Sequence, residues 1–173
     1  RAFVQPKYQS AEMGRKSLFA LDNLWDGIGG LVATDPSIKY LAGKVTIYST
    51  SPDKSRKAMI YYLEKFFGDR EKMLISKHPE TCTDEERAEF DAMFCADTAK
   101  DNYKILNTFV KSMNDSIPPL IHSYIELSSS MKTFGTTFDP DFGDCYDTAM
   151  IITINDIYEP KKKRYIESYF EQK

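Results

Sequence analysis

Four polar residues near the start of the chain have the types and spacing of an anion site: Gly14, Arg15, Lys16 and Ser17. They follow a segment with the pattern of a strand, at Ala2 to Gln5, and precede an amphipathic helix pattern, at Leu18 to Ile28. A loop that opens a helix presents free backbone N–H groups and faces the positive end of the helix dipole. The pattern therefore predicts a phosphate-binding loop. An ordinary strand-loop-helix unit has the same pattern, and the glycines of the Walker and dinucleotide loops are absent.

Clustered carboxylates lie between two predicted strands, Phe134 to Phe138 and Ala149 to Ile154. They are Asp139, Asp141, Asp144 and Asp147. Carboxylates in a site can hold an acceptor ammonium group or take its proton, and we assign Asp139 and Asp141 to substrate binding. They equally form turns, because an aspartate side chain bonds to the backbone of its own loop. The spacing of a calcium-binding EF-hand loop is absent.

Composition narrows the class of protein. With 173 residues and 42% hydrophobic side chains the chain can bury a core, and we expect one domain over residues 1–173. The net charge of −3 argues against a nucleic-acid binder, which carries a basic surplus. Its 3 cysteines, without C-x-x-C spacing, indicate neither a disulfide framework nor a zinc site, so no metal is predicted. No apolar run approaches the roughly 20 residues of a membrane span, and a reduced cytoplasmic protein fits these features.

Strand and helix patterns alternate after the first helix. Ser37 to Tyr48 is rich in β-branched and aromatic residues and predicts a strand, with a bulge expected at Gly43. Ser51-Pro52-Asp53 has the cap, proline and acid of a helix start, and Gly68 is expected to end that helix in a left-handed conformation. This order of elements predicts parallel strands joined by right-handed crossovers.

Three further helices are predicted in the second half. Thr83 and Glu86 have the spacing of a capping box at the start of a short helix. Asn102 to Met113 has apolar residues at helical spacing, and a helix restarts at Ile117-Pro118-Pro119, where prolines are tolerated in the first turn. We interpret the apolar faces of the last two helices as packing surfaces rather than cofactor sites.

Several stretches resemble one acyltransferase superfamily. The FVQPKYQ run, the loop after it and the LW.GI helix are similar to the central segment of the GNAT superfamily. They are closer still to its ornithine-lipid N-acyltransferase branch, often labelled hemolysin-like. The PPLI..Y helix start, the D-P-D-F turn and the strand after it resemble the same branch in the same order. Together with the residues up to Phe67, the match covers most of the chain.

The resemblance implies an α/β fold of the GNAT type, a mixed sheet in which two central parallel strands splay apart, flanked by helices. The strands that normally build its acceptor side precede Arg1 and are expected to be missing from this chain. In that superfamily the strand matching Phe3, Val4 and Gln5 lends its backbone to the pantetheine arm of the donor. The loop matching Gln9 to Ser17 holds the phosphates, although its spacing departs from the usual Q/R-x-x-G-x-G/A pattern. Arg1 matches an arginine that follows a glutamate in this branch, and we assign it to substrate binding.

A helix that carries two tyrosines supplies the catalytic candidates. AMIYYLEKFF, at Ala58 to Phe67, is similar to the A-x-x-x-Y-E-K-x-G-F helix of the superfamily, with Phe66 in place of the glycine. A tyrosine there can protonate the departing thiolate, because its hydroxyl is protonated at neutral pH. Tyr62 matches the spacing more closely, and Tyr61 is the second candidate. Both side chains could instead pack in the core.

The tail over residues 160–173 combines cations with an apolar face. The cations are at Lys161 to Arg164, and the apolar residues are Tyr165, Ile166, Tyr169 and Phe170. A basic cluster beside an apolar face can attach a helix to an anionic membrane surface, and a solvated charge run has the same composition.

These features together predict a cytoplasmic N-acyltransferase, with peripheral attachment to the inner face of the membrane. It would transfer a fatty acyl group from acyl carrier protein or coenzyme A to a small amino acid such as ornithine or glycine, in aminolipid synthesis. No tightly bound cofactor is expected. Two alternatives are an acetyl-coenzyme A-dependent GNAT enzyme acting on a small amine or a protein, and a non-catalytic interaction module.

Overall fold

The computed structural model describes residues 20–171, and the chain divides into two compact units. One unit is Tyr40–Asp156, and the other combines the first 39 residues with Ile157–Lys173. The single domain that we expect over residues 1–173 stays a prediction.

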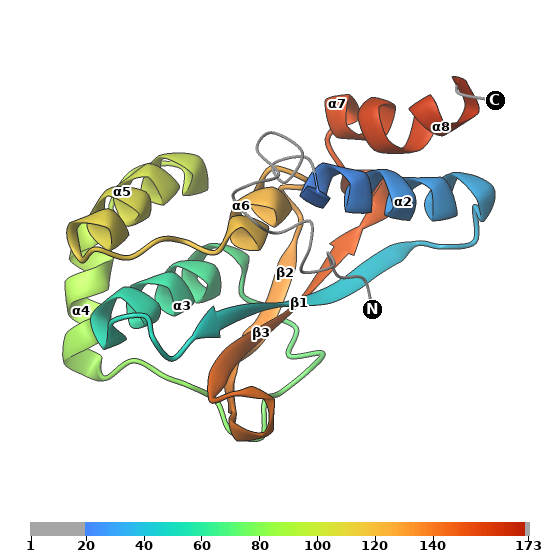
Figure 1. Cartoon of the computed structure of the whole chain (residues 1–173). Helices are drawn as coiled ribbons and strands as arrows, with labels where there is room; N and C mark the ends of the chain where they lie inside the picture. The colour runs from blue at the N-terminus through green and yellow to red at the C-terminus, as the bar shows by residue number, and fades with distance from the viewer. Residues whose placement is uncertain (1–19, 172–173) are drawn as a thin grey trace, which may run out of the picture. The chain divides into compact units, whose positions relative to one another are not determined.

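A three-stranded antiparallel sheet forms the centre of the unit Tyr40–Asp156 (Figure 1). Its strands are β1 (Tyr40–Tyr48), β2 (Lys132–Asp139) and β3 (Cys145–Thr153), in the order β1-β3-β2. Mixed α/β architecture is thus confirmed, and the strand pairs among residues 20–171 are antiparallel. The expected parallel neighbour of β1 is the strand at residues 2–5, which lies outside the described residues.

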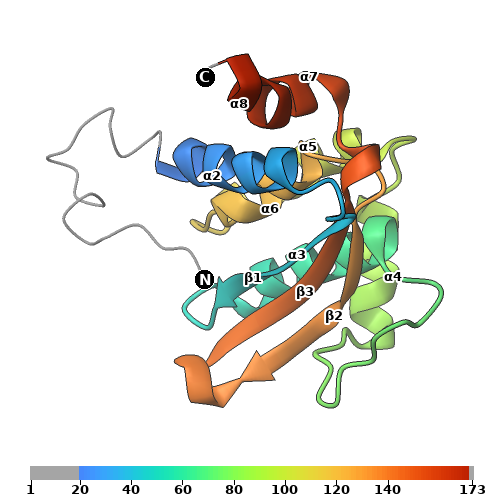
Figure 2. The ribbon, with the colours of Figure 1, turned by 90° about the vertical axis from the view of Figure 1, so that its right-hand side faces the viewer.

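The two faces of β1 differ in chemistry because side chains alternate along a strand. Val45 and Ile47 are buried on the face that the helices cover. Figure 2 shows α3 and α4 on the same side of the strands. Lys44 and Thr46 point to the opposite face, where both bond to the carboxylate of Asp147. The sheet therefore has one apolar face and one polar face.

Helix α3 (Asp53–Phe67) packs its apolar residues on the sheet, but neither of its ends has the predicted geometry. Pro52 rather than Ser51 is the cap and makes no side-chain bond. The carboxylate of Asp115 instead accepts a hydrogen bond from Ser55 in the first turn, at 2.7 Å. Gly68 has a φ of −57°, so the predicted left-handed conformation is wrong. A Cβ at Gly68 would lie 2.4 Å from the carbonyl oxygen of Glu64, so close packing explains the glycine.

The bulge predicted at Gly43 is also wrong. The register between β1 and β3 is continuous from Tyr40 to Tyr48. The irregularity lies in β2, between Thr133 and Thr136, where Gly135 has a φ of +84° that glycine adopts at little cost. An extra residue there turns both threonines to the helix-covered face.

Three shorter helices complete this unit: α4 (Asp84–Met93), α5 (Ala99–Ser112) and α6 (Pro119–Ile125). The capping box of Thr83 and Glu86 is confirmed, since each side chain bonds to the backbone N–H of the other. Pro119 occupies the first turn of α6, as predicted. The strands β2 and β3 are joined by η3 (Pro140–Phe142), and η4 (Ile154–Asp156) follows β3.

The other unit contains α2 (Ala20–Thr34) and the C-terminal helices α7 (Glu159–Lys162), η5 (Lys163–Glu167) and α8 (Ser168–Glu171). The guanidinium of Arg164 donates to the carboxylate of Asp26 at 2.7 Å. The ring of Tyr165 lies 6.3 Å from that of Trp25, and its backbone is so close to Gly29 that a Cβ there would clash. Tyr165 of the tail thus packs against α2, whereas Phe170 is 62% exposed. Among residues 20–171 no helix is long and apolar enough to cross a membrane.

Candidate active site

Tyr62, the first catalytic candidate, lies at the centre of an aromatic cluster. Its side chain is fully buried, and its hydroxyl donates to the backbone carbonyl of Ala99 at 2.8 Å. The rings around it belong to Phe66, Phe67, Phe94 and Tyr103. Burial raises the pKa of Tyr62, which favours the neutral hydroxyl. Its proton-donor role stays a prediction, but its surroundings are those of a packed structural side chain.

Tyr61, the second candidate, packs on the other side of α3. Its ring contacts those of Phe90 and Phe94, with centroids 5.6 and 6.5 Å away. Burial, reinforced by a hydrogen bond to the carboxylate of Asp91, raises the pKa of Tyr61 to about 12. These aromatic and carboxylate contacts explain Tyr61 as a structural link between α3 and α4. Its catalytic role also stays a prediction.

The edge of β1 that faces away from β3 has no strand partner among residues 20–171. Ala42, Gly43 and Lys44 are exposed in this part of the strand. An unpaired strand edge presents a row of backbone N–H and C=O groups that can bind an extended chain. The edge is therefore a candidate wall for a substrate groove.

A third tyrosine lies beside this strand. A Cβ at Gly43 would be 2.8 Å from the hydroxyl oxygen of Tyr124, so only glycine leaves room for that hydroxyl. Tyr124 comes from α6 and is half-buried, and burial raises its pKa. The hydroxyl is thus held protonated at neutral pH, close to the middle of β1. Sequence patterns place Tyr124 on the inward face of its helix without a chemical role; the glycine in an otherwise branched strand is the signal for this close approach.

The aspartates assigned to substrate binding lie away from Gly43, near the end of β1 at Tyr48. Asp139 pairs with Cys145, which also pairs with Tyr48. Tyr48 is five residues along the strand from Gly43, a separation of roughly 17 Å. Asp141 is exposed within η3, a short turn that closes at Gly143 with a φ of +77°. Asp139 precedes this turn but makes no side-chain cap bond to it, and the binding role of both carboxylates stays a prediction.

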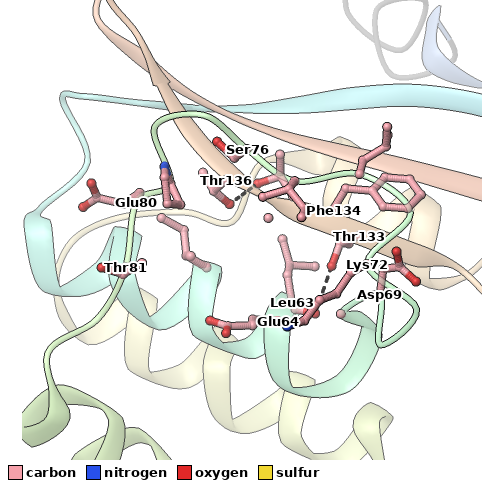
Figure 3. Close-up of a pocket in the computed structure, with 17 residues that line it drawn as sticks. Leu63, Glu64, Asp69, Lys72, Ser76, Glu80, Thr81, Thr133, Phe134 and Thr136 are labelled. Carbon is pink, nitrogen blue, oxygen red and sulfur yellow. Dashed lines mark hydrogen bonds between the residues drawn. The ribbon is translucent and has the colours of Figure 1, made fainter.

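A cavity of about 320 Å³ lies between α3, the bulge of β2 and the loop at residues 69–81 (Figure 3). Leu63 and Thr133 line it, and the hydroxyl of Thr133 donates to the carbonyl of Leu63. Thr136 and Thr148 share a buried hydrogen bond of 2.6 Å on the same wall. These three threonine hydroxyls are thus already paired, and the lining also includes the charged side chains of Glu64, Asp69, Lys72 and Glu80.

Several predicted site residues lie outside the described residues, and their roles stay predictions. They are Arg1, Phe3, Val4, Gln5, Gln9, Gly14, Arg15, Lys16 and Ser17. Within residues 20–171, no three His, Cys, Asp or Glu side chains are grouped so as to hold a metal ion.

Two relatives of known name match the chain along nearly its whole length. One is a glycine N(alpha)-acyltransferase of Phocaeicola vulgatus, 44% identical over 173 residues, with 99% of this chain and 52% of the relative covered. The other is a glycine N(alpha)-acyltransferase of Bacteroides thetaiotaomicron, 42% identical over 174 residues, with 99% and 50% covered. No family model and no solved structure matches. Neither name mentions the hemolysin-like or ornithine-lipid branch, and the chain spans about half the length of these relatives.

Proposed function

We propose that the protein containing this chain is an N-acyltransferase that moves an acyl group from a thioester to the amine of glycine or another small amino acid. One observation carries the proposal: two relatives named glycine N(alpha)-acyltransferase match 99% of the chain at 44% and 42% identity. The donor is an acyl thioester of acyl carrier protein or coenzyme A. The product is an N-acyl amino acid, which we assign to aminolipid synthesis in the cytoplasm.

The unpaired edge of β1 supports a place for the donor. Backbone groups along this edge, which no strand among residues 20–171 pairs, would bind the amides of the pantetheine arm, as in the addition of an extended chain to a sheet edge. Ala42, Gly43 and Lys44 of this strand are exposed.

In the proposed reaction the neutral amine attacks the thioester carbonyl, the C–N bond forms, and the C–S bond breaks. The departing thiolate takes a proton, and the nitrogen loses one to solvent or to a basic group. We assign the proton donor to Tyr124, because its hydroxyl lies against Gly43 and burial keeps it protonated at neutral pH. Tyr62, whose hydroxyl donates to Ala99, becomes the structural tyrosine of the pair.

The test uses the protein with the sequence that precedes Arg1 in its gene. Purified enzyme is mixed with an acyl thioester, on carrier protein or on coenzyme A, and with glycine, ornithine or no amine. The expected result is an N-acyl amino acid detected by mass spectrometry, with one free thiol released for each product molecule. Release of free fatty acid in place of amide, by a cooperatively folded enzyme, would contradict the proposal.

A further inference from the structure

An exposed loop between α3 and α4 combines apolar side chains with cations. Three consecutive apolar residues are more than half exposed: Met73 at 53%, Leu74 at 59% and Ile75 at 78%. Large adjacent side chains of this kind are uncommon on the surface of a soluble domain and mark a contact with an apolar partner. We call residues 70–78 the MLI loop.

Both ends of the MLI loop are fastened to β2. The N–H of Asp69 donates to the carbonyl of Thr133 at 2.8 Å, and that of Glu80 donates to the carbonyl of Thr136 at 2.8 Å. At the first turn, the carboxylate of Asp69 accepts the N–H groups of Glu71 and Met73. The loop is therefore held at both ends, and its Leu74 and Ile75 are more than half exposed although they also line the cavity beside β2.

Three exposed cations flank the apolar residues. Arg70, Lys72 and Lys77 form no ion pair within the described part of the chain. Of the three acids from Asp69 to Glu80, Glu71 pairs with Lys132 at 2.9 Å, the side chain of Asp69 is 2% exposed, and Glu80 is half-buried. Unneutralised cations on both sides of an apolar projection complement an anionic surface with an apolar interior.

We infer that the MLI loop docks on an anionic lipid bilayer, with Met73, Leu74 and Ile75 entering the interface and the cations meeting the head groups. A bilayer accepts exposed apolar side chains without a complementary pocket, whereas a protein partner would need a matching apolar site. An acidic protein is the competing occupant. The inference does not depend on acyl transfer.

The experiment is co-sedimentation of the protein with vesicles of phosphatidylcholine, alone or mixed with phosphatidylglycerol. Binding should require the anionic lipid and weaken as salt is raised. Leu74→Ser with Ile75→Ser should lower partitioning by at least about tenfold, because apolar burial is lost. Lys72→Gln with Lys77→Gln should lower it about fivefold for each lysine, on anionic vesicles only.

Matched controls separate the loop from other surfaces. Tyr48→Ser with Phe142→Ser removes two exposed aromatic side chains from the hairpin end of the sheet, and binding should persist. Lys161→Gln with Lys163→Gln removes the same charge from the tail, and binding should again persist. An environment-sensitive label on Ile75→Cys, in a Cys95→Ser background, should report an apolar surrounding when vesicles are added.

Three outcomes would overturn the inference: no vesicle binding by the unaltered protein, equal binding by the loop variants, or a label that reports water at the bilayer. Capture of an acidic carrier protein through the loop, without vesicle binding, would assign it to a protein partner. Vesicle binding is measured without turnover, so its failure leaves the proposed acyl transfer untouched, and failed acyl transfer leaves vesicle binding untouched.

Discussion

Tyr62 and Tyr124 have different surroundings in the structure, and we propose a different function for each. Tyr62 is enclosed by aromatic rings, and its hydroxyl donates to the carbonyl of Ala99. Tyr124 is half-buried, and its hydroxyl lies against Gly43 in a strand with one unpaired edge among the described residues. Both hydroxyls are kept protonated by burial, which raises the pKa of each. The two hydroxyls differ in their neighbours, which are the carbonyl of Ala99 for Tyr62 and Gly43 of β1 for Tyr124.

This comparison shows what a helix motif alone leaves out. Spacing in the helix at Ala58–Phe67 predicts which residues share a face, but it does not say which structural element that face meets. For a proton donor, geometry at the reacting atom comes first and pKa second. Tyr124 meets β1, whereas Tyr62 meets the start of α5.

The largest expected effect is that of Tyr124→Phe. If its hydroxyl protonates the departing thiolate, kcat should fall by about 10²-fold to 10⁴-fold, the usual contribution of a general acid. Affinity for the acyl donor and the melting temperature should change little, since the ring remains. Steady-state kinetics and a melting curve check both. A donor thioester with a more acidic thiol should recover part of the lost rate, which a packing defect would not allow.

The next effect is that of Gly43→Ala. The new Cβ would lie 2.8 Å from the Tyr124 hydroxyl oxygen and should displace it, lowering kcat by about tenfold or more through misplacement. In the Tyr124→Phe background the same change should cost little further rate, because no hydroxyl is left to displace. If the kcat losses of Gly43→Ala and Tyr124→Phe simply multiply in the double variant, Gly43 does not act through the Tyr124 hydroxyl.

A smaller effect, on stability alone, is expected from Tyr62→Phe. The change removes the hydrogen bond to Ala99, and the unfolding free energy should fall by about 0.5–1.5 kcal/mol. The carbonyl of Ala99 lies in the first turn of α5 and keeps its helical partner, which limits the loss. Denaturant unfolding measures it. No change in stability would mean that this hydrogen bond contributes nothing.

A second effect on stability concerns alkaline pH. The pKa of Tyr61 is raised to about 12 in the folded state, while a tyrosine in the unfolded chain has a pKa near 10. The unfolded chain therefore loses this proton first, so the stability contribution is complete below pH 10 and declines between about pH 10 and 12. Tyr61→Phe should make the loss of stability over this range shallower. Identical slopes in denaturant unfolding at several pH values would rule out this contribution.

Local signals in the sequence predicted much of the fold. The capping box of Thr83 and Glu86, the proline start of α6 and the strand β2 are each determined by a few neighbouring residues. The contact between Gly43 and Tyr124 joins segments far apart in the chain, and no pattern of single-helix spacing contains it. The error at Pro52 has the same origin, since the distant Asp115 bonds to that helix end, whereas the close packing at Gly68 is with Glu64 of its own helix.

Composition alone is also a poor guide to the chemistry of the tail. Its cations and aromatic residues resemble those of a membrane-binding helix, but Tyr165 packs against Trp25 and Arg164 pairs with Asp26. The MLI loop has no chemical assignment from the sequence, yet it exposes its apolar residues. The contacts of Tyr165 and Arg164 with α2, which composition does not give, distinguish the tail from the loop.

The comparison of the two tyrosines is tested most directly by single-turnover acyl transfer, measured side by side for Tyr124→Phe and Tyr62→Phe in the protein with its upstream sequence. Enzyme in excess over acyl donor isolates the chemical step from product release. We expect the chemical step to slow only in Tyr124→Phe, while only Tyr62→Phe unfolds at lower denaturant. A slow chemical step in Tyr62→Phe, with a normal rate in Tyr124→Phe, would contradict the account and return the proton donor to α3.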